Sequence, residues 1–509
     1  MSIARHQMEY YVAYLVLLCL LWWSINLLRQ LSSRKPGSGG NQLPPGPRPL
    51  PIIGNILKLG DKPHQALAKL SGIYGSVMMI KLGAITTAVI SSPEATKEAL
   101  QKNDQFLCGR QIPDTAKGSG LHTQSVVWLP TSDKWKQLRK VCTVQMFSAH
   151  KLDAGQLLRR KKVDELVSFI HESCQRGHHV DIGKAAFTTV LNLISSTLFS
   201  VDLAHHDEGS SQEFRDLVWG VMEETGKPNV SDFFPVLRWF DPQGARRRIS
   251  SYFGRLLAIF DRMIEERTQA RASPVASSRC NDVLDSLINL KESGELTRGE
   301  IKSLLLDLFV AGVDTSTSSL EWAMAELLHN PEKIARAREE LDRAGGGRDG
   351  GTLQEPDIAG LPYLQAIVKE TLRLHPPVPF LIPRKAERDV EICGFRLPRH
   401  AQVLVNVWAM GRDPGIWPDP DRFVPERFLG REIDFKGRDF ELIPFGTGRR
   451  ICPGMPLAYR MVHLILASLL RSFDWKLEQG ARPEDMDMTE KFGITLQKAT
   501  PLCAIPMEV

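Results

Sequence analysis

Residues 444–454 read PFGTGRRICPG, and this stretch decides how the rest of the chain is interpreted. One cysteine, Cys452, stands among three glycines, two arginines and two prolines. A core cysteine would have apolar neighbours, a disulfide needs a partner, and a zinc site needs a second ligand nearby. No cysteine or histidine lies close to Cys452 in the sequence, which disfavours a metal site built locally from several side chains.

The residues around Cys452 suit a sulfur that carries negative charge. Glycines permit close approach to a flat macrocycle and leave backbone N–H groups free to face the sulfur. A helix predicted to start near Met455 would direct its positive end at the thiolate, and Arg450 suits a carboxylate of the macrocycle. The pattern therefore favours a single thiolate ligand to an iron that four porphyrin nitrogens already hold. The alternative is a reactive or structural cysteine in a tight turn.

The bulk properties are those of a large globular protein. Of the 509 residues, 43% are hydrophobic and 24% charged, and length alone would suggest two or more domains. The net charge of +5 is mild and no dense basic block is present, so we expect no nucleic-acid partner. The eight cysteines are scattered without a CxxC pair, which indicates a reducing environment and no disulfide framework.

The N-terminal region predicts a membrane anchor. Residues 10–28, YYVAYLVLLCLLWWSINLL, contain no charge, and a helix that crosses a bilayer needs roughly 20 residues. Arg29, Arg34 and Lys35 follow, so the positive-inside rule leaves the body of the protein in the cytosol. A cleaved signal peptide or a buried helix is the alternative. We expect an anchor at 1–30, a Gly/Pro-rich hinge at 31–60 and the remaining domain at 61–509.

The rest of the chain predicts a mainly α fold with a small β region. Two β-rich runs flank Gly83 as a hairpin, and a helix should open after Ser92. Residues 131–330 are mostly helical in pattern and end in one long helix, 297–330, whose apolar residues cover more than one face. Short strand signals return at 389–398 and 401–408.

The long helix contains a second chemical motif, AGVDTS, at residues 311–316. Thr315 stands four residues after Ala311, so its hydroxyl can bond that carbonyl and open the helix locally. Asp314 is an acid beside this alcohol and could start proton delivery. Ordinary packing of small residues is the competing interpretation.

Two further motifs pair charged or aromatic residues on helices. In KETLR, Glu370 and Arg373 are three residues apart, and a distant PERF segment supplies Arg427. In WKQLR, Trp135 and Arg139 are four residues apart on one helix face. Taken alone, each could be a solvated ion pair, a surface cation or a core indole.

Taken together, these motifs resemble the cytochrome P-450 monooxygenases over essentially the whole chain. FGTGRRICPG matches the haem-binding signature of that family at every fixed position: Phe445, Gly448, Arg450, Cys452 and Gly454. PPGPRPLPIIGN, HPPVPFLIPRKA, NVWAMGRDP and KFGITLQKATPL look like a plant microsomal branch, and the chain is most similar to the geraniol 8-hydroxylase group of terpenoid hydroxylases. That group also includes diterpene oxidases and a tyrosine 3-hydroxylase of pigment synthesis.

The resemblance implies a single haem-thiolate domain with the cytochrome P-450 fold. Haem b would have Cys452 as its axial ligand, Phe445 and Gly454 in the loop beside it, and Trp135, Arg139, Arg384 and Arg450 at its propionates. Thr315 and Asp314 would manage protons during oxygen activation, and Glu370, Arg373 and Arg427 would hold the structure together on the haem side.

The partners implied are O2, membrane lipid and an NADPH–cytochrome P-450 reductase that passes on electrons from NADPH. The reductase would dock on a basic face that includes Lys134, Lys136 and Lys140. The expected location is the endoplasmic reticulum membrane, with a single-pass anchor and the catalytic domain facing the cytosol.

The substrate pocket should be apolar, with Val310, Ala311, Val378, Ile382 and Ile494 as candidate walls. This favours a mono- or diterpenoid, with hydroxylation of tyrosine or another phenol as the second choice. Asp307 could meet the ammonium of an amino acid, although a polar contact to a neighbouring helix or to the pocket entrance is the preferred interpretation. A haem-thiolate isomerase or dehydratase and a non-catalytic haem sensor are the other classes considered.

Overall fold

The computed structural model describes residues 17, 22, 24, 42–118, 120–206, 210–272, 282–344, 353–478 and 481–509. Apart from Leu17, Trp22 and Ser24, which are helical, the predicted anchor lies outside the described residues.

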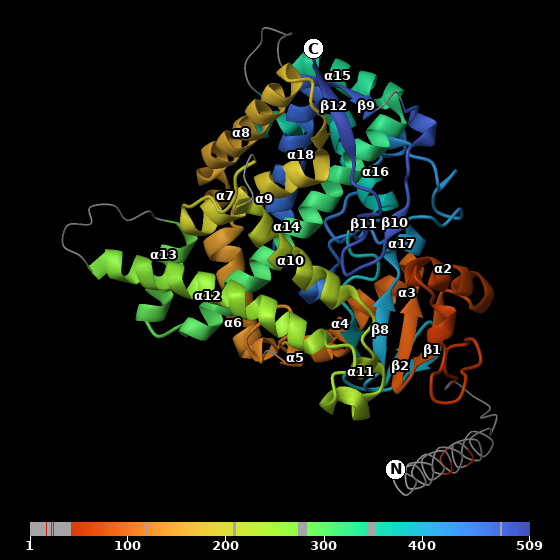
Figure 1. Ribbon diagram of the computed structural model, residues 1–509. Helices are drawn as coiled ribbons and strands as arrows, with labels where there is room; N and C mark the ends of the chain where they lie inside the picture. Colours follow the sequence, from red (N-terminus) through yellow and green to blue (C-terminus); the bar gives the residue numbers. More distant parts are fainter. Residues whose placement is uncertain are drawn as a thin grey trace, which may run out of the picture.

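A mixed sheet forms the smaller region of the molecule, at the lower right of Figure 1. Its strand order is β1 (Val77–Leu82), β2 (Ile85–Ile90), β8 (Gln402–Val405), β5 (Arg384–Lys385) and β3 (Gly109–Arg110). The hairpin predicted around Gly83 is confirmed, with a φ of +56° at that glycine, and α3 (Pro93–Lys97) begins after the Ser92 cap as expected. Only β2 and β8 pair in parallel. The register places Arg110 opposite Arg384, so two distant parts of the sequence bring two cations together.

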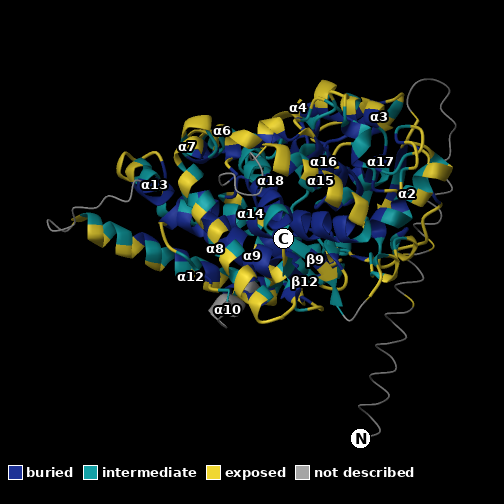
Figure 2. Ribbon diagram, turned by 90° about the horizontal axis from the view of Figure 1, so that it is seen from above, coloured by how far each residue is buried: buried dark blue, intermediate teal, exposed yellow. Residues whose placement is uncertain are grey.

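The larger region is helical and surrounds α14 (Arg298–His329), which runs through its middle in both ribbon views (Figures 1 and 2). The side chain of Thr297 and that of Glu300 cap its N-terminus reciprocally. Apolar residues such as Leu304, Phe309 and Leu320 are fully buried on different sides of the helix. The predicted long buried helix is therefore confirmed. Its covering helices are α9 (Ile182–Phe199), α10 (Ser210–Gly226), α12 (Ala245–Ala272), α16 (Pro362–Leu374) and α18 (Met455–Ser472).

Within the described part of the chain, one helix is long and apolar enough to cross a membrane, and this is α9. In the fold, 83% of that segment is buried. It packs between α8 (Gln156–Gln175) and α14. Such burial is typical of a core helix.

A second, three-stranded sheet has the order β4 (Val180–Asp181), β12 (Cys503–Glu508) and β9 (Phe473–Leu477). It lies at the end of the molecule that carries the C-terminus (Figure 1). The remaining elements include α2 (Pro63–Tyr74), α4 (Asp104–Leu107), α5 (Asp114–Gly118), α6 (Asp133–Val141), α7 (Ala149–Ala154), α11 (Val230–Phe233), α13 (Val283–Glu292), α15 (Pro331–Ala344), α17 (Val407–Met410), β6 (Val390–Ile392), β7 (Phe395–Leu397), β10 (Glu490–Lys491) and β11 (Gln497–Lys498).

The proline-rich segment that precedes the first sheet is attached to it. Met79 N donates to Pro45 O over 2.8 Å, and the side chain of Asn55 bonds the carbonyls of Pro47 and Arg48. A Cβ on Gly46 would lie 1.8 Å from Met79 O, so only glycine fits against the strand there. Residues 45–55 are thus packed on β1.

Candidate active site

The loop around Cys452 places its sulfur at the N-terminus of α18. The backbone N–H groups of Gly454 and Met455 face the sulfur, and Cys452 N donates to Phe445 O over 2.9 Å. The helix starts at Met455, as predicted. Burial raises the pKa of the Cys452 thiol, whereas the two N–H groups and the positive charge of Arg139 oppose that rise. The N–H groups and the nearby charge are the surroundings that a thiolate ligand needs.

Backbone conformation fixes this loop. Gly448 has a φ of +69°, and a Cβ there would lie 2.8 Å from Leu100 O and 2.9 Å from Asp104 Oδ1. Any side chain would therefore clash with the protein behind the loop. The glycine of the motif is required because it lets the loop pack against α4.

Three predicted cations and one indole gather beside the loop. Arg450 stacks on Trp135, with its guanidinium carbon 4.7 Å from the ring centroid, and its Nε donates to Cys108 O over 3.0 Å. Arg384 Nη1 donates to Asp104 Oδ1 over 2.8 Å, while Arg139 donates to the carbonyl beside Cys452. The structure thus brings Trp135, Arg139, Arg384 and Arg450 into one region, although each donor also has a partner within the protein.

A fourth cation, Arg110, was missed by the sequence analysis. It lies on β3 opposite Arg384, and its Nη1 donates to Ile382 O over 2.7 Å. Burial, followed by the charges of Arg384 and Arg450, lowers its pKa well below the usual range. No motif marks Arg110, because a two-residue strand is too short to give a periodic signal.

This group of arginines fits a ligand that carries carboxylates. Buried cations are normally paired, because an unpaired charge is expensive to desolvate. Within the described chain, the carboxylate that bonds Arg384 is that of Asp104, which also accepts from Arg449 over 3.1 Å. Burial, and then the positive charge of neighbouring arginines, lowers the pKa of Arg110 and of Arg450. Two propionates beside a thiolate donor match this arrangement, so the residues present fit a haem.

One face of α14 is open although the helix lies in the core. Ala311 is exposed, and Val310 and Thr315 are partly exposed, whereas Phe309 and Val313 beside them are fully buried. Protein side chains therefore do not cover this face. Thr315 Oγ1 donates to Ala311 O over 2.7 Å, as the sequence predicts.

The predicted trio of charges on the haem side is assembled and buried. Arg373 Nε and Nη2 each lie 2.7 Å from a carboxylate oxygen of Glu370, and both side chains are fully buried. Arg427 Nε donates to the same carboxylate over 3.0 Å. Arg373 also donates to Pro420 O over 2.7 Å, so the trio fastens the irregular segment between α17 and the PERF turn to α16.

Comparison with known proteins identifies the family. The family model described as "Cytochrome P450" matches residues 44–503. This chain is a cytochrome P-450. Curated relatives at similar identity are cytochrome P450 76AD1 of Beta vulgaris (50% identical over 97% of this chain and 99% of the relative), geraniol 8-hydroxylase of Catharanthus roseus (51%, over 97% and 99%) and drimenol monooxygenase of Persicaria hydropiper (49%, over 92% and 93%). The resemblance to the plant geraniol 8-hydroxylase group is thereby confirmed, together with the fold class.

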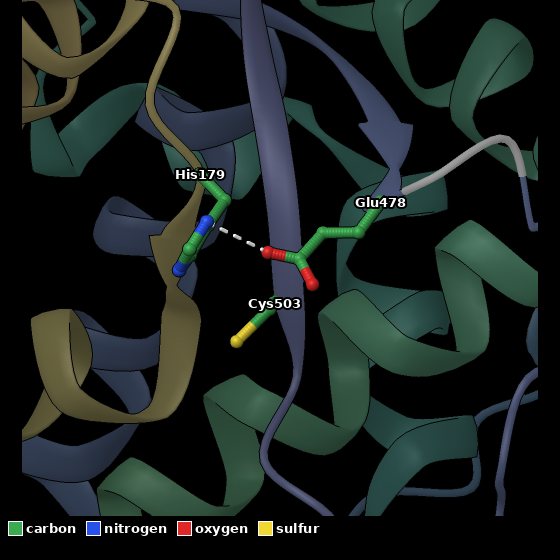
Figure 3. A group of neighbouring side chains, drawn as sticks. All are labelled: His179, Glu478 and Cys503. Carbon is green, nitrogen blue, oxygen red and sulfur yellow. Dashed lines mark ion pairs between the residues drawn. The ribbon is translucent and has the colours of Figure 1, made fainter.

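As a member of the P-450 family, this chain is a haem-thiolate oxidoreductase. Two cysteines of the described chain, Cys452 and Cys503, differ in how well their surroundings suit an iron ligand. Cys503 lies on β12 beside His179 and Glu478 (Figure 3). Burial and the acids Asp181, Glu478 and Glu321 raise the pKa of its thiol to about 11. Cys452 has backbone donors and an arginine instead, and it also occupies the family signature. Cys452 is therefore the candidate for the iron ligand of this P-450.

The acid of the AGVDTS motif is covered by the 495–497 segment. Asp314 is buried, and its Oδ1 accepts from Gln497 Nε2 over 2.8 Å. Burial raises the pKa of Asp314, and the hydroxyl of Thr495 and the amide of Gln497 oppose that rise. A hollow of about 60 Å³ borders Asp314 and is lined also by Glu223 and Lys491. The hollow has room for water beside Asp314. The sequence analysis did not identify Gln497 as a partner of Asp314.

The predicted pocket walls of the P-450 come from segments that converge on α14. Val310, Val378, Ile382 and Ile494 are all partly exposed. Leu496 N donates to Pro377 O over 2.7 Å, which joins the 377–382 segment to the 494–497 segment. Gly226, at the end of α10, packs directly on the backbone of Ile494. The walls are thus near one another in the fold, and their contact with substrate remains a prediction.

Asp307 is engaged within the protein. Its Oδ1 accepts from Ser125 Oγ over 2.8 Å and its Oδ2 from Val126 N over 2.8 Å. Burial raises the pKa of Asp307 to about 7, and the hydrogen bonds from Ser125 and Val126 oppose that rise. The carboxyl group therefore ties α14 to the 125–129 segment, which agrees with the preferred interpretation of a polar contact.

Proposed function

We propose that this protein is a haem b monooxygenase that hydroxylates an apolar mono- or diterpenoid, using O2 and electrons from NADPH delivered by a cytochrome P-450 reductase. The observation that carries the proposal is the Cys452 sulfur at the N-terminus of α18, next to four arginines of which Arg384 and Arg450 are buried. The relatives named geraniol 8-hydroxylase and drimenol monooxygenase support a terpenoid substrate. The overall change would be R–H + O2 + NADPH + H⁺ → R–OH + H2O + NADP⁺.

In this proposal the chain holds the haem at two places. Cys452 would supply the axial sulfur, with Phe445 and Gly454 shaping the loop beside it. Trp135, Arg110, Arg139, Arg384 and Arg450 would bind the propionates. When bound, the haem supplies the activation of dioxygen and the oxygen insertion, and a thiolate ligand favours O–O cleavage.

Protons would reach the site from the Asp314 side of α14. Asp314 borders a hollow with room for water, and Gln497 donates a hydrogen bond to its carboxyl group. Thr315 presents a hydroxyl on the open face, where its bond to Ala311 O keeps the oxygen in place. These two neighbours would relay a proton from solvent to the open face of the helix.

The open face and the converging loops would form the substrate pocket. Val310, Val378, Ile382 and Ile494 would contact the substrate, together with Ala311 on the open face. A free amino acid would need partners for its ammonium and carboxylate groups, and Asp307 already accepts hydrogen bonds from Ser125 and Val126. An apolar substrate therefore fits better than tyrosine. Thr315 and Asp314 favour a monooxygenase over an isomerase, a dehydratase or a haem sensor.

We place the protein on the endoplasmic reticulum membrane, anchored through residues 1–30 with the catalytic domain in the cytosol. Residues 45–55, which fall within the predicted hinge, are packed on β1 and belong to the folded body. The reductase would dock on the basic face at α6. There Lys134 pairs with Glu300 over 2.6 Å and Lys136 with Asp133 over 2.9 Å, which leaves the exposed Lys140 as its best contact among the three lysines.

The test combines a ligand change with a substrate screen. The reduced wild-type protein with carbon monoxide should show the red-shifted band of a thiolate-bound haem, and Cys452→Ser should lose both the band and turnover, because an alcohol is a far weaker donor to iron. Cys503→Ser is the matched control and should keep both. Loss of the band in Cys503→Ser alone would overturn the ligand assignment.

The substrate screen uses microsomes that contain a plant reductase, supplied with geraniol, drimenol, an abietane diterpene or tyrosine. We expect NADPH-dependent hydroxylation of at least one terpenoid and none of tyrosine. Hydroxylation of tyrosine alone would overturn the terpenoid assignment. Turnover without NADPH would instead indicate an isomerase or dehydratase.

A further inference from the structure

Three side chains that can bind a metal ion converge on the second sheet, far along the chain from the haem loop. His179 directly precedes β4, Cys503 begins β12, and Glu478 directly follows β9 (Figure 3). Their ligand atoms all lie within 4.8 Å of one another. In the described residues this is the one group of three or more such side chains that comes this close.

The strand register explains why these side chains share one face. Cys503 pairs with Asp181, and His179 lies two residues before Asp181, so both histidine and cysteine point to the same side of the sheet. Ala504 pairs with Leu477, which places Glu478 level with Cys503 on the other neighbouring strand. The three groups therefore come from three adjacent strands, which provide a rigid support.

The local charge favours a cation. Asp181, Glu478 and Glu321 all act on the Cys503 thiol with negative charge. His179 Nδ1 lies 2.9 Å from Glu478 Oε1, and the two side chains are 62% and 35% exposed, so an ion and a water molecule can reach them. The thiol itself is only partly exposed.

We propose that His179, Glu478 and Cys503 form a surface site for Zn²⁺, with the fourth position taken by water. Imidazole, thiolate and carboxylate together suit zinc, whereas Ca²⁺ and Mg²⁺ require oxygen ligands. Zinc–ligand bonds of about 2.0–2.3 Å in a tetrahedron separate the ligand atoms by about 3.3–3.6 Å. The side chains need to move by about 1 Å to reach that geometry. The bound ion would join β4, β12 and β9.

The test is zinc binding by the haem-loaded, full-length protein. The protein is stripped with a chelator, dialysed against micromolar ZnCl2, and assayed for zinc and iron by mass spectrometry. We expect one zinc per haem iron in the wild type and a loss of at least tenfold in zinc affinity in His179→Ala and in Cys503→Ser. His178→Ala and Cys393→Ser are matched controls at an exposed histidine and an exposed cysteine, and both should retain the zinc.

Two further measurements distinguish a zinc site from a His179–Glu478 ion pair beside a thiol that binds no metal. Zinc should protect Cys503 from alkylation, read from the modified peptide, and should raise the thermal unfolding temperature of the wild type but not of Cys503→Ser. Equal zinc binding by the wild type and Cys503→Ser, or alkylation of Cys503 that zinc does not slow, would overturn the proposal. The haem band with carbon monoxide should be unchanged in all four variants, which keeps this test independent of the proposed function.

Discussion

At the scale of single residues, Thr315 combines a hydrogen bond within α14 with a position on the open face of that helix. Its hydroxyl is bonded to Ala311 O, and its side chain lies on the open face of the helix. Thr317, two residues on, makes the equivalent bond to Val313 O over 2.9 Å but is buried. The two threonines thus share a hydrogen-bond pattern and differ in what they face.

Replacing Thr315 by alanine should uncouple the reaction. NADPH and O2 should still be consumed, while product per NADPH falls by about tenfold or more and hydrogen peroxide rises, because proton delivery by a positioned group contributes factors of about 10²–10⁴. The measurement is the ratio of product and peroxide to NADPH. Thr317→Ala should leave that ratio near the wild-type value. Unchanged coupling in Thr315→Ala would mean that protons take another route.

The raised pKa of Asp307 predicts that the free energy of unfolding depends on pH. Its pKa in the folded protein is about 7, above that of an unfolded aspartate at about 3.9, so the folded state binds the proton more tightly. Stability from this group is therefore present at low pH and is lost as the pH rises from about 4 to about 7. Asp307→Asn keeps the shape and one acceptor without the charge.

The free energy of unfolding of Asp307→Asn minus that of the wild type should be about 1–3 kcal/mol larger at pH 8 than at pH 5. Urea unfolding of both proteins at the two pH values measures the difference. Asp133→Asn, at an exposed acid whose pKa the side-chain hydrogen bond from Lys136 lowers, should show no such gain. The same stability difference at pH 5 and pH 8 would contradict the assignment of a buried, proton-holding carboxyl group.

At the scale of elements, the sequence predicted the features that depend on local patterns or on the motifs of the family, and missed contacts that depend on the tertiary fold alone. The α14 helix and the start of α18 follow from local patterns, and both are confirmed. The contact between Glu370 and Arg427 depends on residues far apart, yet the resemblance predicted it and the structure places Nε and the carboxylate 3.0 Å apart. Arg110 and Gln497 could not be found in this way, because each lies on a two-residue strand whose neighbours are set by the tertiary fold.

The charge trio on α16 gives the element-scale prediction. Glu370→Gln should destabilise the protein by about 3–5 kcal/mol, because Arg373 and Arg427 would lose the carboxylate that compensates them in a buried site. The measurements are the urea midpoint and the haem content per chain, and both should fall. Glu339→Gln removes an exposed partner of Arg343 and should cost less than about 1 kcal/mol. A Glu370→Gln protein with normal haem content and midpoint would rule out a stabilising role for the trio.

At the scale of the whole molecule, the proposed anchor and the catalytic body should be separable. Removing residues 1–30 should shift the protein from the membrane fraction toward the soluble fraction and leave the haem spectrum unchanged, because the described segment that follows, residues 42–55, is itself hydrogen-bonded to the strands of the body. The measurement is sedimentation of membranes followed by the carbon monoxide difference spectrum. Failure of the truncated protein to take up haem would contradict the division. Partial membrane retention would not, since other apolar surface such as Trp239 and Phe240 is exposed.

Residues 494–496, near the C-terminus, complete the candidate substrate pocket. Ser318 Oγ of α14 donates to Leu496 O over 2.8 Å, Leu496 N donates to Pro377 O, and Gly226 packs on Ile494. During synthesis these contacts can form only after the C-terminal segment has left the ribosome. A nascent chain stalled before residue 490 would contain the Cys452 loop and the arginines, yet its pocket would remain open on one side. Stable capture of haem should therefore require that residues 494–497 have emerged, and stalled chains of increasing length would reveal the length at which the haem becomes resistant to extraction.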